Sequence, residues 1–138
     1  MRVVLDTNIL VAALITKGAP PDRLWQAWLR GEIELVTSIA QLAEVSAVLA
    51  RPRLAKYVDP EEAAAILDNI DSRALVLDAL PDVNLSPDPD DNPILAAAIA
   101  GKADLIVSGD KKHMLALGEA EGIPIVTARD ALDRLGGK

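Results

Sequence analysis

The sequence predicts an α/β fold, a three-layer α/β/α sandwich whose mainly parallel sheet has about five strands. Short apolar runs alternate with longer helical segments along the chain, as expected when helices cover both faces of a parallel sheet. The apolar residues make up 51% of the chain and include no Phe, which is typical of an aliphatic sheet buried on both sides. With 138 residues, the chain (1–138) is expected to form a single domain.

Five segments are predicted to be strands because each is a short run dominated by Val, Leu and Ile. The first of them, RVVL, ends directly at Asp6. A carboxylate at the end of a buried strand is costly unless it has a partner. The predicted strands span 2–5, 33–36, 74–77, 104–107 and 123–126.

The segments between these strands carry helix start and stop signals. Ser38 and Gln41 form the pattern of a capping box, and a proline followed by two acids begins the helix after Asp59. Asn92 is expected to cap a helix whose first residue is Pro93. Residues 80–93, rich in proline and aspartate, are expected to form a loop. The predicted helices span about 8–15, 21–29, 39–51, 60–73, 93–100, 111–120 and 128–135.

The residue content excludes several kinds of site. The chain has no Cys and a single His, which argues against disulfide scaffolds, thiol nucleophiles and ordinary zinc sites. A bound metal would therefore have oxygen ligands, which favours Mg²⁺ or Mn²⁺. The net charge of −7 argues against nucleic-acid binding by bulk electrostatics. Neither a signal peptide nor a membrane-spanning apolar run is evident, so we expect a cytoplasmic protein.

Four acidic residues are predicted to meet at one edge of the sheet. Asp6 follows the first strand, and Asp110 follows the fourth in DLIVSGD. Asp91 precedes the helix that leads to the fourth strand, and Glu44 lies on the helix after the second. In open α/β sheets, ligands bind at the carboxyl ends of the strands. We therefore expect these four carboxylates to surround one site.

Such a cluster needs a compensating positive charge. Two unit charges about 4 Å apart repel by roughly 4 kcal/mol at an effective dielectric constant of about 20, so protons or divalent cations must neutralise the group. Divalent cations held by carboxylates can activate water and stabilise the leaving oxygen of a phosphodiester. This chemistry requires neither Cys nor His.

Each acid by itself also has an ordinary explanation. The two that follow strands can cap the next helix, and Glu44 can be an exposed helix residue. Asp91 can be a solvated loop acid like its neighbours Asp88 and Asp90, and it is preferred over them because it stands directly before the helix. The occurrence of all four acids at one predicted edge favours a site.

Four motifs occur in a fixed order along the chain: DTN (6–8) after the first strand, Glu44 on a helix, DDNPILAAA (90–98) and SGD (108–110). In this order and spacing the chain resembles the PIN-domain family over essentially its whole length, and is most similar to the VapC-like toxins of toxin–antitoxin modules. The resemblance implies a metal-dependent endoribonuclease in which Asp6, Glu44, Asp91 and Asp110 are catalytic and bind Mg²⁺ or Mn²⁺.

The resemblance also implies supporting residues and partners. Thr7 and Asn8 would orient the first carboxylate or a water, Ser108 would support the end of the fourth strand, and Asn92 would assist Asp91. VapC-like proteins form homodimers or larger assemblies, and a cognate antitoxin segment lies in their active-site groove. An RNA substrate and an antitoxin are therefore the expected partners.

Basic residues near the predicted site are candidates for contacts with RNA phosphates, although each can also be a solvated surface charge. These candidates are Arg51, Arg53, Lys56, Lys111 and Lys112. His113 is interpreted as an exposed helix residue without a catalytic role.

Two tryptophans, Trp25 and Trp28, lie one helical turn apart on the same face. Core packing is one interpretation. The other is a surface for self-association or for an antitoxin, because Trp is enriched at interfaces.

Two other functions are considered. A haloacid-dehalogenase-like phosphohydrolase also begins with an Asp after the first strand, but it needs a second acid two residues later, where this chain has Asn8. A non-catalytic module that binds RNA or protein would use the acids merely as caps.

Overall fold

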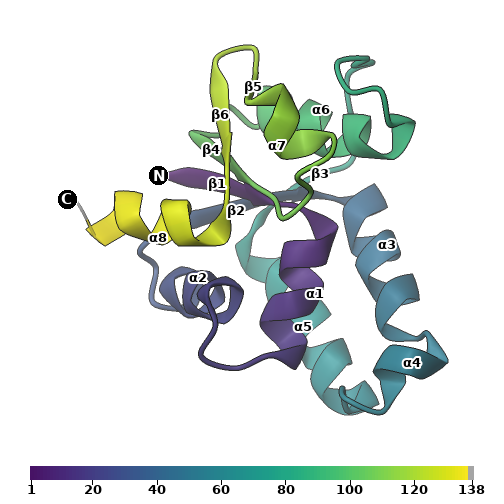
Figure 1. The fold of residues 1–138 in the computed structure, drawn as a ribbon. Helices are drawn as coiled ribbons and strands as arrows, with labels where there is room; N and C mark the ends of the chain where they lie inside the picture. The colour runs from purple at the N-terminus through teal and green to yellow at the C-terminus, as the bar shows by residue number, and fades with distance from the viewer. Residues whose placement is uncertain (137–138) are drawn as a thin grey trace.

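Strands and helices alternate along the chain in the computed structural model, which describes residues 1–136 (Figure 1). The strands are β1 (Arg2–Leu5), β2 (Glu34–Ser38), β3 (Leu75–Leu77), β4 (Leu105–Val107), β5 (Glu119–Ala120) and β6 (Ile123–Val126). The helices are α1 (Thr7–Ile15), α2 (Pro20–Leu29), α3 (Ile39–Leu49), α4 (Pro52–Ala55), α5 (Pro60–Arg73), the 3₁₀ helix η1 (Pro89–Asp91), α6 (Asn92–Ala100), α7 (Met114–Leu117) and α8 (Ala128–Gly136). Among residues 1–136, no helix combines the length and apolar character that crossing a membrane requires.

The strands form one sheet in the order β3-β2-β1-β4-β6-β5. All neighbouring pairs are parallel except β5 and β6, which confirms the predicted mainly parallel sheet. The chain adds β2 and β3 on one side of β1 and then crosses to the other side to add β4. This reversal lies between β1 and β4, and it creates a crevice at their carboxyl ends.

Helices cover both faces of the sheet, as predicted (Figure 1). Val3 and Leu5 of β1 point into a cluster shared with α1, α2, α3, α5 and α8. Val4, between them, points to the opposite face and packs with residues of α6 and α7. Because consecutive side chains of a strand alternate between faces, burial on both sides explains why the strands are continuously apolar.

The close contact between α6 and β2 depends on Gly101. A Cβ atom added to this residue would lie 2.6 Å from Cγ1 of buried Val36 and 3.0 Å from the carbonyl oxygen of Ala97. We expect Gly101→Ala to lower the free energy of unfolding by about 1–3 kcal/mol, because neither neighbour has room to move. Urea denaturation measures this change. Gly136→Ala is the control, since nothing lies within 4 Å of its added Cβ. Equal effects would contradict the steric explanation.

The predicted helix over 111–120 is wrong, because α7 occupies only Met114–Leu117 and β5 follows it. Gly118, with φ of 79°, ends α7. Glu121 and Gly122 both have positive φ, 47° and 86°, which is typical of a two-residue type I′ hairpin turn. This turn pairs Ala120 with Ile123 in the antiparallel β5–β6 hairpin, and the sheet thereby gains a sixth strand.

Two predicted features of α3 are only partly correct. The helix ends at Leu49 instead of continuing to residue 51, and the short helix α4 starts at Pro52. Ser38 caps α3 as predicted, because its Oγ accepts a hydrogen bond from the Gln41 N–H at 3.0 Å. The Gln41 side chain does not complete the capping box. Its Nε2 donates instead to the Leu5 carbonyl oxygen at 2.6 Å.

Asn92 is not the cap of α6. The helix already includes it, and η1 leads directly into the helix through Asp91. The Asn92 Oδ1 accepts hydrogen bonds from the backbone N–H groups of Leu85 and Ser86 at 3.0 and 2.9 Å. The side chain therefore holds the preceding loop against the start of α6.

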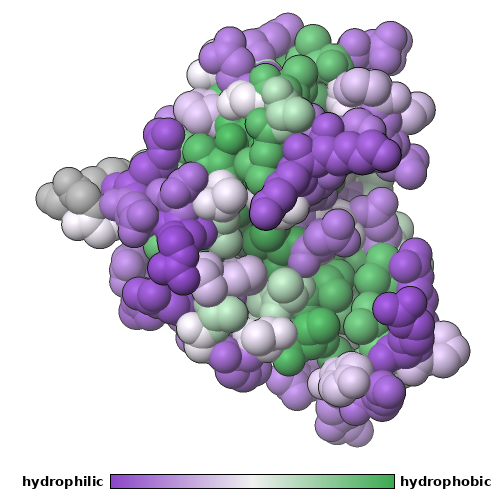
Figure 2. Space-filling model, in the orientation of Figure 1, coloured by the Kyte–Doolittle hydropathy of each residue, from purple (hydrophilic) through white to green (hydrophobic). Residues whose placement is uncertain are grey.

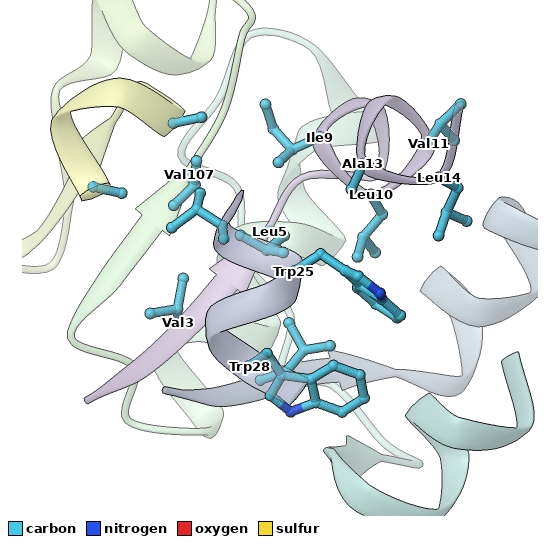
Figure 3. Close-up of a cluster of buried hydrophobic side chains, with 14 of the residues drawn as sticks. Val3, Leu5, Ile9, Leu10, Val11, Ala13, Leu14, Trp25, Trp28 and Val107 are labelled. Carbon is cyan, nitrogen blue, oxygen red and sulfur yellow. The ribbon is translucent and has the colours of Figure 1, made fainter. Parts of the chain in front are cut away.

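Trp25 and Trp28 belong to the core (Figure 3). They are only 4% and 3% exposed, and their ring centroids are 4.9 Å apart. The guanidinium of Arg73 lies 5.0 Å from the ring centroid of Trp28. The core interpretation is confirmed, and the interpretation of these two side chains as a partner surface is wrong.

Candidate active site

An acidic cleft of about 610 Å³ opens at the carboxyl ends of β1 and β4, beside α1, α3 and η1. In Figure 2, drawn in the orientation of Figure 1, hydrophilic side chains gather near these strand ends, and an apolar area lies below them over α1. The structure brings all four predicted acids to this cleft together with two further acids. The acidic lining residues are Asp6, Glu44, Asp88, Asp90, Asp91 and Asp110.

Asp6 is both a helix cap and a cleft residue. Its Oδ1 accepts the Thr7 N–H at 2.8 Å, and its Oδ2 accepts the Ser108 hydroxyl at 2.8 Å. Its own backbone N–H donates to the Val107 carbonyl oxygen at 2.8 Å, which extends the pairing of β1 with β4 beyond the last strand residue. Helix capping and a place in the candidate site, the two explanations of Asp6 from the sequence, therefore do not exclude each other.

Glu44 is tied to the end of β1 through Thr7. The Thr7 hydroxyl donates to Glu44 Oε1, and Gln41 Nε2 lies 3.5 Å from the same hydroxyl oxygen. Thr7 thus contacts the first carboxylate through its backbone and a second carboxylate through its side chain. Asn8 lines the cleft as an exposed residue. The participation of Gln41 was missed, because its sequence pattern is already explained by helix capping.

Asp91 is oriented by a residue that sequence reasoning missed. Buried Ser86 donates its hydroxyl to Asp91 Oδ2 at 2.9 Å. Asn92 contacts the same serine, because its Oδ1 accepts a hydrogen bond from the Ser86 backbone N–H. Its expected assistance to Asp91 is therefore indirect. No sequence motif indicates Ser86, since the contact arises only when the proline-rich loop folds back on η1.

Asp110 faces the cleft from the turn between β4 and α7. Its Oδ1 accepts the backbone N–H groups of Lys112 and His113 at 3.0 and 3.3 Å. The Ser108 hydroxyl that donates to Asp6 also accepts the Asp110 N–H at 3.1 Å. One buried serine thereby links the acids that follow β1 and β4.

His113 is not an exposed helix residue, and this expectation is wrong. It immediately precedes α7, and its side chain is 30% exposed. Its Nδ1 lies 3.7 Å from Asp110 Oδ2 and 4.0 Å from Asp88 Oδ2. Its position three residues after Asp110 was the available sequence signal.

Of the predicted cations, the structure places Arg51 in the lining of the cleft. The other four are exposed side chains that do not line it. Lys56 lies over the ring of Tyr57, with its ammonium 5.2 Å from the centroid. The remaining three are Arg53, Lys111 and Lys112.

Comparison with known proteins identifies the family. A family model described as PIN domain matches residues 2–112. The chain belongs to the PIN-domain family. This PIN domain is 30% identical over 112 residues to Uncharacterized protein MJ1680 of Methanocaldococcus jannaschii, a match that covers 80% of this chain and 72% of that protein.

Two crystal structures share the fold of this PIN domain. FitAcB from Neisseria gonorrhoeae superposes with a TM-score of 0.54 at 12% identity, covering 92% of this chain and 98% of the other. PAE2754 from Pyrobaculum aerophilum superposes with a TM-score of 0.53 at 15% identity, covering 99% and 90%. These likenesses confirm the predicted fold class.

Burial and mutual repulsion make charge costly at two acids of this PIN domain. Burial raises the pKa of the Asp6 carboxyl; hydrogen bonds from Ser108 and Thr7 oppose this, and the charges of Asp91 and Glu44 raise it further. Burial also raises the pKa of Asp91, opposed by the Ser86 hydroxyl.

Asp110 behaves differently, because backbone N–H groups, including those of Lys112 and His113, outweigh the effect of burial and lower its pKa. The cleft thus contains clustered carboxylates. Asp110 ionises easily, whereas Asp6 and Asp91 ionise only at a cost in free energy. This donor set fits a hard divalent cation such as Mg²⁺ or Mn²⁺.

The raised pKa values predict how the stability of the metal-free protein depends on pH. Both Asp6 and Asp91 bind protons more tightly in the folded state than at their ordinary pKa of 3.8. Their stabilising contribution is therefore complete below pH 3.8 and is lost as the pH rises through the raised values. In EDTA, we expect the Tm of the wild type to fall relative to that of Asp6→Asn as the pH rises over the range above 3.8. A constant difference across this range would contradict the prediction.

Proposed function

We propose that this protein is a metal-dependent endoribonuclease that hydrolyses RNA phosphodiesters. The observation that carries the proposal is the convergence of Asp6, Glu44, Asp91 and Asp110 in one cleft of a PIN domain. These four residues would hold Mg²⁺ or Mn²⁺. When bound, the cation supplies Lewis-acid activation of water and neutralises charge that develops on the phosphate and the leaving oxygen.

The chain itself contributes positioning and electrostatics. Ser108 and the Thr7 N–H orient Asp6, and the Thr7 hydroxyl orients Glu44. Ser86 does the same for Asp91. A carboxylate locked by such contacts needs no rearrangement when a cation binds, and this preorganisation lowers the cost of binding.

Arg51 in the cleft lining is the candidate for holding a substrate phosphate, since a guanidinium binds phosphate oxygens in bidentate geometry. The exposed cations outside the cleft would contact the RNA backbone further away. These are Arg53, Lys56, Lys111 and Lys112.

The proposal is tested by incubating the purified protein with mixed cellular RNA in Mn²⁺, in Mg²⁺ and in EDTA, with single-stranded DNA in parallel. We expect cleavage of RNA in either metal, none in EDTA, and recovery when excess metal is added back. Cleavage confined to DNA would refute the substrate class. Metal binding without cleavage of either nucleic acid would favour the non-catalytic module.

Membership in the PIN-domain family argues against the haloacid-dehalogenase-like alternative. That chemistry also needs a carboxylate two residues after the first acid, where Asn8 stands exposed at the cleft. We therefore do not propose phosphotransfer.

We further propose the role of a toxin with a cognate antitoxin, which rests on the resemblance of the sequence to VapC-like proteins. An apolar groove of about 400 Å³ between α3, α4 and α5 supports a protein partner, with Leu49, Val58 and Leu67 in its lining. Inducible expression in a bacterial host is expected to arrest growth with the wild type but not with Asp6→Asn. We also propose a homodimer, as the resemblance implies, and light scattering of the purified protein tests it.

A further inference from the structure

We propose that the cleft contains an outer cation position in which the His113 imidazole is a ligand together with Asp88 and Asp91, and that this position prefers Zn²⁺ to Mg²⁺. Each of the three residues offers one ligand atom, and these atoms all lie within 4.8 Å of one another. The match to the family model covers residues 2–112, which include Asp88 and Asp91 but not His113.

The spacing of the donor atoms is close to what one ion requires. Zn²⁺ bonds of about 2.0–2.1 Å to nitrogen and oxygen place two ligands of the same ion roughly 3–4 Å apart. His113 Nδ1 lies 4.0 Å from Asp88 Oδ2 and 3.7 Å from Asp110 Oδ2. The side chains of His113 and Asp88 are 30% and 37% exposed, so small rotations can close the remaining gap.

Two carboxylates are held with one oxygen free toward the imidazole. Asp88 Oδ1 accepts the Asp90 N–H at 3.0 Å, and it is the other oxygen that faces His113. Asp110 Oδ1 likewise accepts backbone N–H groups, and again Oδ2 faces the ring. Backbone anchoring of one oxygen in each carboxylate therefore leaves the other facing the imidazole, as ligand-orienting hydrogen bonds do in metal sites. Of these two acids, Asp88 belongs to the three-residue cluster, and Asp110 lies beside it.

The chemistry of the donors separates this position from the inner one. Carboxylates alone suit Mg²⁺ and Mn²⁺, whereas an imidazole nitrogen suits Zn²⁺ and similar transition metals. Asp6 and Glu44 provide oxygen only. The charge of Asp91 interacts both with Asp6 and with His113. Asp91 is thus placed to serve both positions. The inner position rests on the proposed function, but the outer one is defined without RNA.

The single histidine of the chain makes a direct test possible. The metal-free, ¹⁵N-labelled protein is titrated with Zn²⁺ and, separately, with Mg²⁺, while the two ring nitrogen resonances are observed by NMR. We expect Zn²⁺ to shift the Nδ1 resonance strongly and Mg²⁺ to leave it unchanged. Binding of Zn²⁺ with both ring resonances unchanged would overturn the proposal, as would a response confined to Nε2.

Calorimetry of variants supplies the second measurement. His113→Gln and Asp88→Asn are each expected to weaken Zn²⁺ binding by about tenfold or more. Asp90→Asn is the matched control. This substitution removes the same charge from the same loop as Asp88→Asn, but Asp90 contributes no atom to the three-residue cluster. Equal weakening by all three variants would indicate general electrostatic attraction and refute the site.

Asp6→Asn distinguishes this proposal from the proposed function. We expect it to abolish RNA cleavage while Zn²⁺ still shifts the His113 resonance. If the wild type cleaves no RNA but shows the shift, the outer position stands and the nuclease proposal fails. If the wild type cleaves RNA but Zn²⁺ does not shift the His113 resonance, the nuclease proposal stands and the outer position is refuted.

Discussion

Asp6→Asn is expected to lower metal-dependent RNA cleavage by about a thousandfold or more, which corresponds to roughly 4 kcal/mol of transition-state stabilisation. Asp6 stands at the point where the strand order reverses, next to Ser108 at the end of β4. Asparagine keeps the size of the side chain and an oxygen that can accept the Thr7 N–H. It removes the negative charge that a divalent cation at the inner position requires, so cation binding there should fail while the fold persists.

The measurement is the initial rate of RNA cleavage in Mn²⁺, together with the shift in Tm caused by Mn²⁺. Asp22→Asn is the matched control, since Asp22 is 7% exposed and Asp6 is 8% exposed. Asp22 accepts the Gly18 N–H at 2.9 Å and does not line the cleft. We expect it to retain both cleavage and the Mn²⁺-induced shift. Cleavage that survives Asp6→Asn would exclude this carboxylate as an essential ligand.

Trp25→Ala is expected to lower the free energy of unfolding by about 3–5 kcal/mol, because deleting a large buried aromatic ring leaves a cavity. The ring lies among buried aliphatic side chains that include Leu10 and Leu14 of α1 (Figure 3). It also contacts Trp28 at a centroid distance of 4.9 Å. Such a loss is a large fraction of the total stability of an ordinary domain, so the variant should be partly unfolded near 37 °C.

Urea denaturation followed by circular dichroism measures this loss. Tyr57→Ala is the comparison, because Tyr57 is 64% exposed and truncation of a surface side chain usually changes stability by less than about 0.5 kcal/mol. Similar losses in the free energy of unfolding for both variants would show that the surroundings of Trp25 stabilise the fold no more than those of an exposed side chain. That result would contradict the assignment of Trp25 to the core.

Much of the fold was predictable because its signals are local. The runs RVVL, IELV, ALVL, DLIV and IPIV carry strand character in their own residues, and β1, β2, β3, β4 and β6 appear at those places. The β5–β6 hairpin was missed because positive φ at Glu121 is not a preference of glutamate. The short length of α7 likewise depends on Gly118, which ends the helix. The predicted helix over 111–120 did not take this glycine into account as a helix end.

The candidate site, like the fold, was predictable from sequence only in part. The placement of Asp6 and Asp110 after two strands, with Glu44 and Asp91 at helix starts or flanks, was sufficient to predict one cleft from sequence, since parallel strands present their carboxyl ends at one edge. Sequence could not decide what each side chain contacts. The hydroxyl of Ser86 and the amide of Gln41 reach the site only through tertiary folding.

The sequence by itself thus determined the order of five of the six strands in residues 1–136, the family and the four candidate acids, because these depend on residue type and spacing. Only the tertiary structure decided that the tryptophans are core residues and that His113 faces Asp88 and Asp110. Burial and the direction of a side chain are set by which distant segments pack together. That packing joins Asp88 and His113 across 25 residues of chain, a distance over which no local preference acts.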